Sequence, residues 1–346
     1  MMIQTVRTIT RRGLLSLAAA FGLAPATDAA KKKKGKKKRC QRGLTRCGNK
    51  CFDLQSSAAH CSRCNNRCQG ERTCESGQCA CRKQVCLLSS QETNFFPEQL
   101  TANSSGDSIV ATLPSEHQLL SFGPPPTTIG EFGNEPGEFD FPEDVVDVDG
   151  DLYVADNGNQ RIQRLRANGE IQIIPVAGFP SGVAVDGAGT VYATYSGQAH
   201  RLDEAGNEIV SWGPGGDPDT FFDFPVDVVA GPAAIYVVDG FGNRLYSFLE
   251  SPPGIITENW VVGPGSDPGE LRDPVAVAIF GERVFVTDQG NQRVQALNWL
   301  NGAPEFEWQA NDSFGLWDPE GIAIDASGRI YVTSFDTLLT FEIGNP

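Results

Sequence analysis

The segment DNGNQRIQRL, residues 156–165, places acidic, amide and guanidinium side chains close together. Asp156, Asn159 and Arg161 carry the functional groups of an acid–base or substrate-binding cluster. The same residue types also build tight turns, because Asp accepts hydrogen bonds from backbone N–H groups and Asn and Gly tolerate turn conformations. Whether the cluster is unique or recurs therefore decides between a catalytic and a structural interpretation.

The cluster recurs in the chain. A catalytic constellation is expected once, whereas a turn device is expected in every repeat. The echoes are DQGNQRVQAL at 288–297, with Asp288, Asn291 and Arg293, and DGFGNRLYSF at 239–248, with Asp239, Asn243 and Arg244. We therefore interpret the cluster as structural: Asp156 ends a strand, Gly158 supplies a left-handed conformation, Asn159 tolerates one, and Arg161 pairs with the carboxylate.

Six repeats organise residues 97–346. Each begins at a proline that precedes a short run of small apolar residues: Pro97, Pro142, Pro180, Pro225, Pro274 and Pro319. A β-branched and aromatic run follows each of these, such as DLYVAD or RVFVTD, and two further runs complete the repeat. Small residues in the first run and Tyr or Phe in the second suit blades that diverge from an axis. The sequence predicts an all-β fold, a six-bladed β-propeller.

The last repeat is long enough for three strands only. We expect residues 87–95 to supply the fourth strand, beside residues 338–343, and so to close the ring. The repeats resemble the NHL family, on the pattern Pro-x-x-hydrophobic, then YVAD, then N-x-R-hydrophobic in FPEDVVDVDGDLYVADNGNQRIQRLRANGE. The resemblance covers roughly residues 90–346. It implies either binding of protein or RNA across one face of the propeller, or a lyase or hydrolase with a divalent metal in the central channel.

Few residues of the propeller suit enzyme chemistry. Only His117 and His200 lie there, both expected on third strands away from the axis, and imidazole-based metal chemistry needs several converging histidines. No G-x-S-x-G motif and no cysteine nucleophile occur in this region. A calcium site made of carboxylates stays open, because four aspartates are expected near the ends of first strands: Asp147, Asp149, Asp186 and Asp325.

Charge divides the chain into two regions. Residues 1–90 hold 19 of the 28 Lys and Arg, whereas residues 91–346 hold nine Arg and 39 acidic residues. Nucleic acids are held chiefly by Lys and Arg contacts to phosphate, so this acidic region is a poor nucleic-acid partner. It suits cationic partners or calcium, or is simply a soluble surface.

Residues 1–30 have the pattern of a cleaved signal peptide. Arg11 and Arg12 precede the apolar run 13–24, which is too short to span a bilayer, and small residues follow. TRRGLL resembles a twin-arginine export signal, and an ordinary secretory signal is the alternative. The basic segment Lys31–Arg39 then reads as a linker, or as a tether that contacts an anionic cell surface. Both features predict an extracellular or cell-surface protein.

A cysteine-rich module is expected at 40–86. All ten cysteines of the chain fall here: Cys40, Cys47, Cys51, Cys61, Cys64, Cys68, Cys74, Cys79, Cys81 and Cys86. An even number in an exported chain predicts a disulfide framework of undetermined pairing, and a zinc site around CSRC at 61–64 is the competing interpretation. The spacing resembles that of Stig1-type secreted proteins, which implies extracellular recognition.

The sequence as a whole favours a non-enzymatic binding or scaffold protein with an unidentified protein or glycan ligand. Its expected parts are the signal peptide 1–30, the basic linker 31–39, the cysteine-rich module 40–86 and the propeller 87–346. The alternative is a metal-assisted lyase or hydrolase. The long loops 212–225 and 262–274 contain Trp212, Phe221 and Phe222. These aromatic residues are either exposed anchors for a partner or packing between blades.

Overall fold

The computed structural model describes residues 45–47, 50–52, 73–75, 78–80, 85–103, 105–123, 125–203, 205–309 and 316–343. The chain divides into two units, Met1–Cys40 and Gln41–Pro346, and all of the described residues belong to the second. The predicted signal peptide, the basic linker and the side chains of the ten cysteines lie outside the described part. Within that part, no helix has the length and apolar character needed to cross a membrane.

Two short antiparallel hairpins precede the propeller. One pairs β1 (Thr45–Cys47) with β2 (Lys50–Phe52), and the other pairs β3 (Thr73–Glu75) with β4 (Gln78–Ala80). Both fall in the region that the sequence assigns to the cysteine-rich module.

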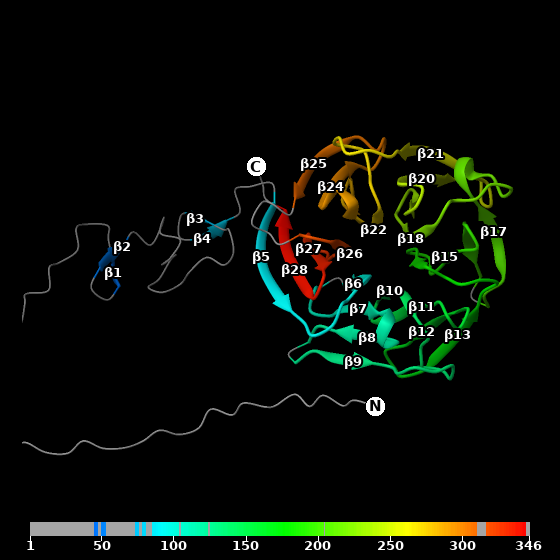
Figure 1. Cartoon of the computed structure of the whole chain (residues 1–346), viewed down its shortest axis with the longest axis horizontal. Helices are drawn as coiled ribbons and strands as arrows, with labels where there is room; N and C mark the ends of the chain where they lie inside the picture. The colour runs from blue at the N-terminus through cyan, green and yellow to red at the C-terminus, as the bar shows by residue number, and fades with distance from the viewer. Residues whose placement is uncertain are drawn as a thin grey trace, which may run out of the picture. The chain divides into compact units, whose positions relative to one another are not determined.

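Six four-stranded antiparallel sheets form a six-bladed propeller, which confirms the predicted all-β fold. Figure 1 shows the sheets arranged around a common axis. Blade 1 contains β6 (Leu100–Ala102), β7 (Ile109–Leu113), β8 (Gln118–Ser121) and β9 (Thr127–Ile129); blade 2 contains β10 (Pro142–Val148), β11 (Asp151–Asp156), β12 (Arg161–Leu165) and β13 (Ile171–Pro175). Blade 3 contains β14 (Gly182–Val185), β15 (Val191–Tyr195), β16 (Gln198–Leu202) and β17 (Glu208–Trp212); blade 4 contains β18 (Pro225–Ala230), β19 (Ile235–Asp239), β20 (Arg244–Glu250) and β21 (Ile256–Val262). Blade 5 contains β22 (Pro274–Phe280), β23 (Arg283–Asp288), β24 (Arg293–Asn298) and β25 (Pro304–Gln309).

Blade 6 joins the two ends of the propeller. Its strands are β26 (Pro319–Ile324), β27 (Arg329–Ser334) and β28 (Thr337–Ile343), and its fourth strand is β5 (Val85–Glu92). Figure 1 shows β5 in cyan alongside β28 in red. The structure thus confirms that residues ahead of the first repeat close the ring, with the strand beginning two residues earlier than predicted.

The hydrophobic core is divided among the six interfaces between neighbouring blades. The cluster between blades 2 and 3 contains Tyr153 from β11 and Val183 from β14, for example, and the cluster between blades 5 and 6 includes Val85 from the closing strand. The aromatic residue predicted on five of the six second strands is buried in such an interface: Tyr153, Tyr192, Tyr236, Phe285 and Tyr331. Three short 3-10 turns complete the described structure: η1 (Pro114–Glu116), η2 (Pro214–Gly216) and η3 (Gln289–Asn291).

Candidate functional site

The Asp–Asn–Arg cluster of blade 2 holds a turn together. Arg161 Nε donates to Asp156 Oδ2 at 2.7 Å, and Asn159 Nδ2 lies 3.0 Å from the same oxygen. Asp156 also accepts the backbone N–H of Asp140, and its side chain is fully buried. The other two guanidinium nitrogens of Arg161 donate to the carbonyls of Asn134, Glu135 and Glu138 in the loop before the blade. Since no face of the carboxylate is open to solvent, this cluster has no room for a substrate.

Blade 5 repeats this arrangement closely. Arg293 Nε lies 2.6 Å from Asp288 Oδ2, and Asn291 Nδ2 donates to both oxygens of Asp288. Arg293 also reaches Glu307 Oε2 at 2.8 Å. The side chains of Asp288 and Arg293 are 0% and 2% exposed, so this is a buried ion pair.

Blade 4 keeps the aspartate of the turn but changes the other partners. Asp239 accepts backbone N–H groups of Asp223, Phe224 and Gly242. Arg244 donates to the Gly242 carbonyl at 3.0 Å instead of to the carboxylate. Asn243 Oδ1 accepts the N–H of Asp273, which belongs to the loop before the next blade. The predicted carboxylate–guanidinium pair is therefore absent among the described contacts of this turn.

The left-handed residue of these turns differs from the prediction. Gln160 in blade 2 and Gln292 in blade 5 have φ of 54°, whereas neither Gly158 nor Asn159 has positive φ. Gly158 is needed for a different reason: a Cβ there would lie 2.6 Å from Asp140 Cγ. In blade 4 the left-handed position is Asn243, with φ of 53°.

The residues considered for metal chemistry do not converge. His117 ends η1 in a left-handed conformation rather than lying on a third strand as predicted, with Nδ1 3.2 Å from Asp140 Oδ1. His200 lies on β16, stacked on Tyr195 and 2.8 Å from Glu208, and its burial lowers the pKa of the imidazole. Within the described residues, no group of three or more His, Cys, Asp or Glu side chains is placed to hold a metal ion.

The four aspartates proposed for calcium mainly serve their own turns. Asp186 accepts the N–H groups of Ala188 and Thr190, and Asp325 accepts those of Ser327 and Arg329. Asp147 accepts the N–H of Gly150, and Asp149 sits beside it in a left-handed turn conformation. The carboxylates of these four aspartates thus do not fit a shared calcium site.

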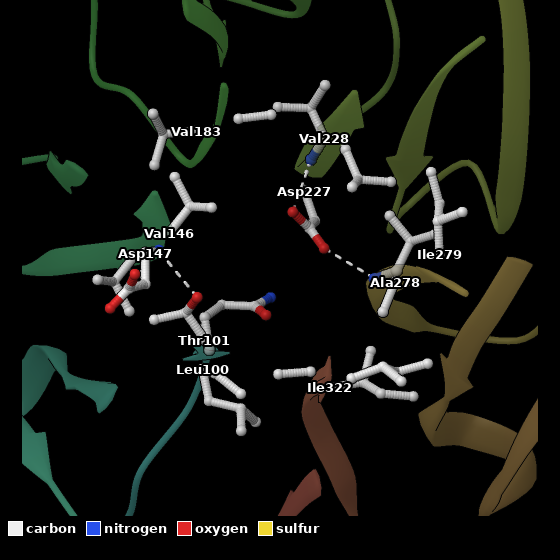
Figure 2. A pocket seen from close by; sticks show the side chains of 18 of the residues that line it. Leu100, Thr101, Val146, Asp147, Val183, Asp227, Val228, Ala278, Ile279 and Ile322 are labelled. Carbon is white, nitrogen blue, oxygen red and sulfur yellow. Dashed lines mark hydrogen bonds between the residues drawn. The ribbon is translucent and has the colours of Figure 1, made fainter. Parts of the chain in front are cut away.

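The first strands of all six blades line a central channel. Its middle part is a cavity of about 200 Å³ whose walls are mostly Val, Ala, Leu and Ile. Figure 2 shows Asp227 and Thr101 among these apolar side chains. Asp227 accepts the N–H of Val228 at 2.6 Å and that of Val277 in blade 5 at 2.7 Å. Its carboxylate thus joins two neighbouring blades.

Asp144 does the same between blades 2 and 3. It accepts the N–H of Val145 and of Val183, each at 2.7 Å. Burial raises the pKa of Asp144 to about 7, and burial together with Asp144 raises the pKa of Asp227. Both carboxylates are engaged with backbone, so they serve as links between blades.

Three glutamates lie at the mouth of the channel, where the first strands begin. Glu98, Glu143 and Glu320 come from blades 1, 2 and 6 and line a cavity of about 290 Å³ with Ser181 and Phe224. Burial, followed by repulsion from the Glu98 and Asp144 carboxylates, raises the pKa of Glu143 to about 7. Burial, followed by repulsion from Glu98 and Asp318, raises the pKa of Glu320 to about 8. Glu320 Oε2 is buried without a hydrogen-bond partner among the described residues. This mouth therefore favours protons or cations.

These glutamates were outside the residues expected from the sequence to form a site. A usable signal exists, because the anchor proline is followed by Glu in three repeats: FPEQ at 96–99, FPED at 141–144 and DPEG at 318–321. The six anchor positions must meet at one end of the axis, so the residue after each proline forms a ring around the mouth.

Stability is expected to fall as pH rises from about 4.5 to about 8. Glu143, Glu320 and Asp144 have raised pKa values, so the folded protein retains protons that the unfolded chain has lost. The contribution of these three groups to the free energy of unfolding is fully present below their pKa values in the unfolded chain. It is lost as the pH rises through their pKa values in the folded protein. Urea denaturation at several pH values measures the trend. Glu320→Gln should flatten the slope, and an unchanged slope in this variant would contradict the assignment.

Exposed aromatic side chains surround this mouth. All of them lie in loops that precede a first strand or in turns between second and third strands, which are on the same face of an antiparallel propeller. We call this surface the aromatic face. Among the described residues its rings, 46–72% exposed, are Phe96, Phe132, Phe141, Phe179, Phe221, Phe224, Phe241, Trp317 and Phe335. The strongly exposed aliphatic residues, such as Ile209 and Leu300, lie on outer strands or on loops of the opposite face.

The three aromatic residues of the 212–225 loop divide between the two predicted roles. Trp212 and Phe222 are buried in the cluster between blades 3 and 4. Phe221 is 63% exposed. Phe224 itself lines the mouth cavity. It stacks on Phe241, with ring centroids 4.7 Å apart, so the two exposed rings form a pair beside the mouth.

Comparisons with known proteins agree with the fold. The structure resembles virginiamycin B lyase from Staphylococcus aureus, with 17% identity and a TM-score of 0.53 over 73% of this chain and 98% of that one. It resembles a luciferin-regenerating enzyme, with 9% identity and a TM-score of 0.55 over 73% and 95% of the chains. An auxiliary nutrient binding protein from Bacteroides ovatus matches at 14% identity and a TM-score of 0.55, over 72% and 69%. At these identities the likeness shows the fold alone.

The sequence comparison is more local. No curated protein matches the sequence. Residues 139–165, which span β10 to β12, match the model of the NHL repeat. The second blade of this six-bladed propeller therefore carries an NHL repeat.

Proposed function

We propose that this protein is an exported, non-enzymatic binding protein that holds its ligand on the aromatic face of the propeller. The observation that carries the proposal is the gathering of exposed rings on one face, around a mouth lined by glutamates. Exposed aromatic side chains gathered on one face mark interaction sites in soluble proteins. The structural likeness to a nutrient binding protein is compatible with this role.

The amino-terminal region completes the proposal. The sequence supports export by the signal at 1–30, contact of Lys31–Arg39 with an anionic surface, and extracellular recognition by a disulfide-bonded module at 40–86. In this proposal the module and the basic segment localise the protein, and the propeller selects the ligand.

The double variant Phe224→Ala/Phe241→Ala tests the role of the aromatic face. Removing this stacked, exposed pair should lower capture of the protein's ligand from culture supernatant by about tenfold or more, because such rings act as binding anchors. Quantitative pull-down with the full-length chain measures the effect. Leu300→Ala, at an exposed position on the opposite face, is the matched control. Equal capture by both variants would contradict the proposal.

An enzyme is the second candidate, and the mouth is the observation that favours it. The pKa of Glu143, about 7, and that of Glu320, about 8, suit general acid–base catalysis near neutral pH. A lyase or hydrolase would use one carboxylate to take a proton and the other to donate one. Turnover of an ester, lactone or uronic-acid substrate that is lost in Glu143→Gln but retained in Phe224→Ala/Phe241→Ala would favour the enzyme over the binding protein.

A further inference from the structure

The arginines of the propeller leave the aromatic face the more acidic of its two faces. Of the nine, four form ion pairs at the opposite face, in the pairs Arg164–Asp151, Arg201–Glu250, Arg283–Glu305 and Arg329–Asp325. Arg166 also lies there and contacts Gln172. Arg161 and Arg293 are buried beneath the aromatic face and engaged with Asp156 and Asp288. Only Arg244 and Arg272 then remain, among the described arginines, to balance the loops of the aromatic face.

Those loops are rich in acidic residues. The described ones around the mouth are Glu116, Glu131, Glu135, Asp140, Asp217, Asp219, Asp223, Asp267, Asp273, Asp318 and Asp336. Of the three mouth glutamates, Glu143 and Glu320 add to this charge as the pH rises through their raised pKa values of about 7 and about 8. A partner of the aromatic face must therefore be cationic, because an anion or nucleic acid would be repelled and a neutral ligand would leave the carboxylates desolvated without compensation.

The size of the site selects among cations. The mouth cavity of about 290 Å³ accommodates one Lys or Arg side chain, with its head near Glu98, Glu143 and Glu320. The exposed rings, however, come from loops of blades 1, 2, 3, 4 and 6, and of these rings only Phe224 lines that cavity. Aromatic rings bind both apolar side chains and cations through their faces. An extended partner with alternating cationic and apolar groups satisfies both features.

We propose that the aromatic face binds an extended basic polypeptide segment of a partner protein, with one Lys or Arg side chain in the glutamate-lined mouth and apolar side chains against Phe224 and Phe241. This inference rests on the proposed binding function and names the chemistry of its ligand. The charge of the face and the volume of the mouth cavity support a cationic side chain, and the spread of the rings supports a long polypeptide.

Fluorescence anisotropy with the full-length protein tests the inference. The probe is a short labelled peptide in which Lys and Leu are separated by Gly and Ser. Matched probes replace Lys by Glu or Leu by Ser, and lysinamide serves as a small-cation competitor. Binding of the Lys–Leu peptide is expected to be at least about tenfold tighter than that of either matched peptide, and to weaken about tenfold between about 50 mM and about 300 mM salt.

Variants locate the contact. Glu143→Gln and Phe224→Ala/Phe241→Ala should each weaken binding of the Lys–Leu peptide by at least about fivefold. Asp149→Asn and Leu300→Ala, on the opposite face, should leave its binding unchanged. Binding should also tighten between about pH 6 and about pH 8.5, because Glu143 and Glu320, facing Glu98, Asp144 and Asp318, ionise over this range. Glu320→Gln should reduce that pH dependence.

The possible failures are distinguishable. Suppose that capture of the natural ligand needs Phe224 and Phe241 but the Glu-containing peptide binds as well as the Lys–Leu peptide. The proposal that the partner is basic is then wrong, and the proposed binding function stands. If lysinamide competes fully at a concentration equal to that of the peptide, the ligand is a small cation and the extended partner is overturned. If face variants change no binding at all, both proposals fail.

Discussion

Replacing Arg293 with Met is expected to lower the free energy of unfolding by about 3–5 kcal/mol, the cost of stranding a buried charge. Asp288, 0% exposed, would lose its 2.6 Å bond to Arg293 Nε while remaining in place through Asn291 and the N–H of Arg272. Three further acceptors would also lose a donor: Glu307 Oε2 and the carbonyls of Asp267 and Glu270. Chemical denaturation measures the loss, and the melting temperature should drop by roughly 10 °C.

Blade 4 offers a matched control for this prediction. Arg244 occupies the same place after its turn but donates to the Gly242 carbonyl, so Arg244→Met should cost less than about 1 kcal/mol. The double variant Asp288→Asn/Arg293→Met should lose less than the sum of the two single losses, because it leaves no unpaired charge. Equal losses for Arg293→Met and Arg244→Met would show that the buried pair adds nothing specific.

Replacing residues 85–92 with a Gly/Ser linker of equal length is expected to lower the free energy of unfolding by about 4 kcal/mol or more. The change removes β5, which leaves β28 as an unpaired edge and exposes Phe341 and Leu339 of the cluster that Val85 covers. Urea denaturation measures the loss. Limited proteolysis should also show new cleavage in 337–343, because an unpaired terminal strand frays.

Strand complementation provides the control for this second prediction. A synthetic peptide of residues 85–92, with Ser in place of Cys86, should restore the midpoint by adding a strand to β28. Ser89→Thr and Ser90→Thr, both at exposed positions of β5, should leave stability nearly unchanged. An unaltered midpoint after loss of β5 would mean that blade 6 is stable with three strands.

The fold was predictable because its information is local and repeated. Each repeat carries a proline, a small apolar run and a β-branched run with Tyr or Phe, and these patterns depend only on neighbouring residues. Pairing of β5 with β28 also followed, since the last repeat lacks a fourth strand and the residues just ahead of the first repeat most simply supply it. The match of residues 139–165 to the NHL repeat agrees with the repeat whose pattern is clearest.

Backbone detail within the turns was harder to predict. Gly158 looked like the left-handed residue, yet its role is close approach to Asp140, and Gln160 adopts the left-handed conformation. His117 looked like a strand residue, yet it caps η1. In both cases the left-handed residue closes a short turn: the Gln160 N–H bonds to the Asn157 carbonyl and the His117 N–H to the Pro114 carbonyl. The general preference for Gly or Asn at such positions did not mark either residue.

The sequence by itself determined the number of blades, the strand order, the closing strand and the acidic character of the propeller, because periodicity and composition need no knowledge of contacts. Only the tertiary structure decided which residues meet. Glu98, Glu143 and Glu320 share the mouth because closure of the ring brings the starts of the first and last blades together. Likewise Phe222 is buried while its neighbour Phe221 is exposed, because the path of one loop against blade 4 turns the two rings to opposite sides.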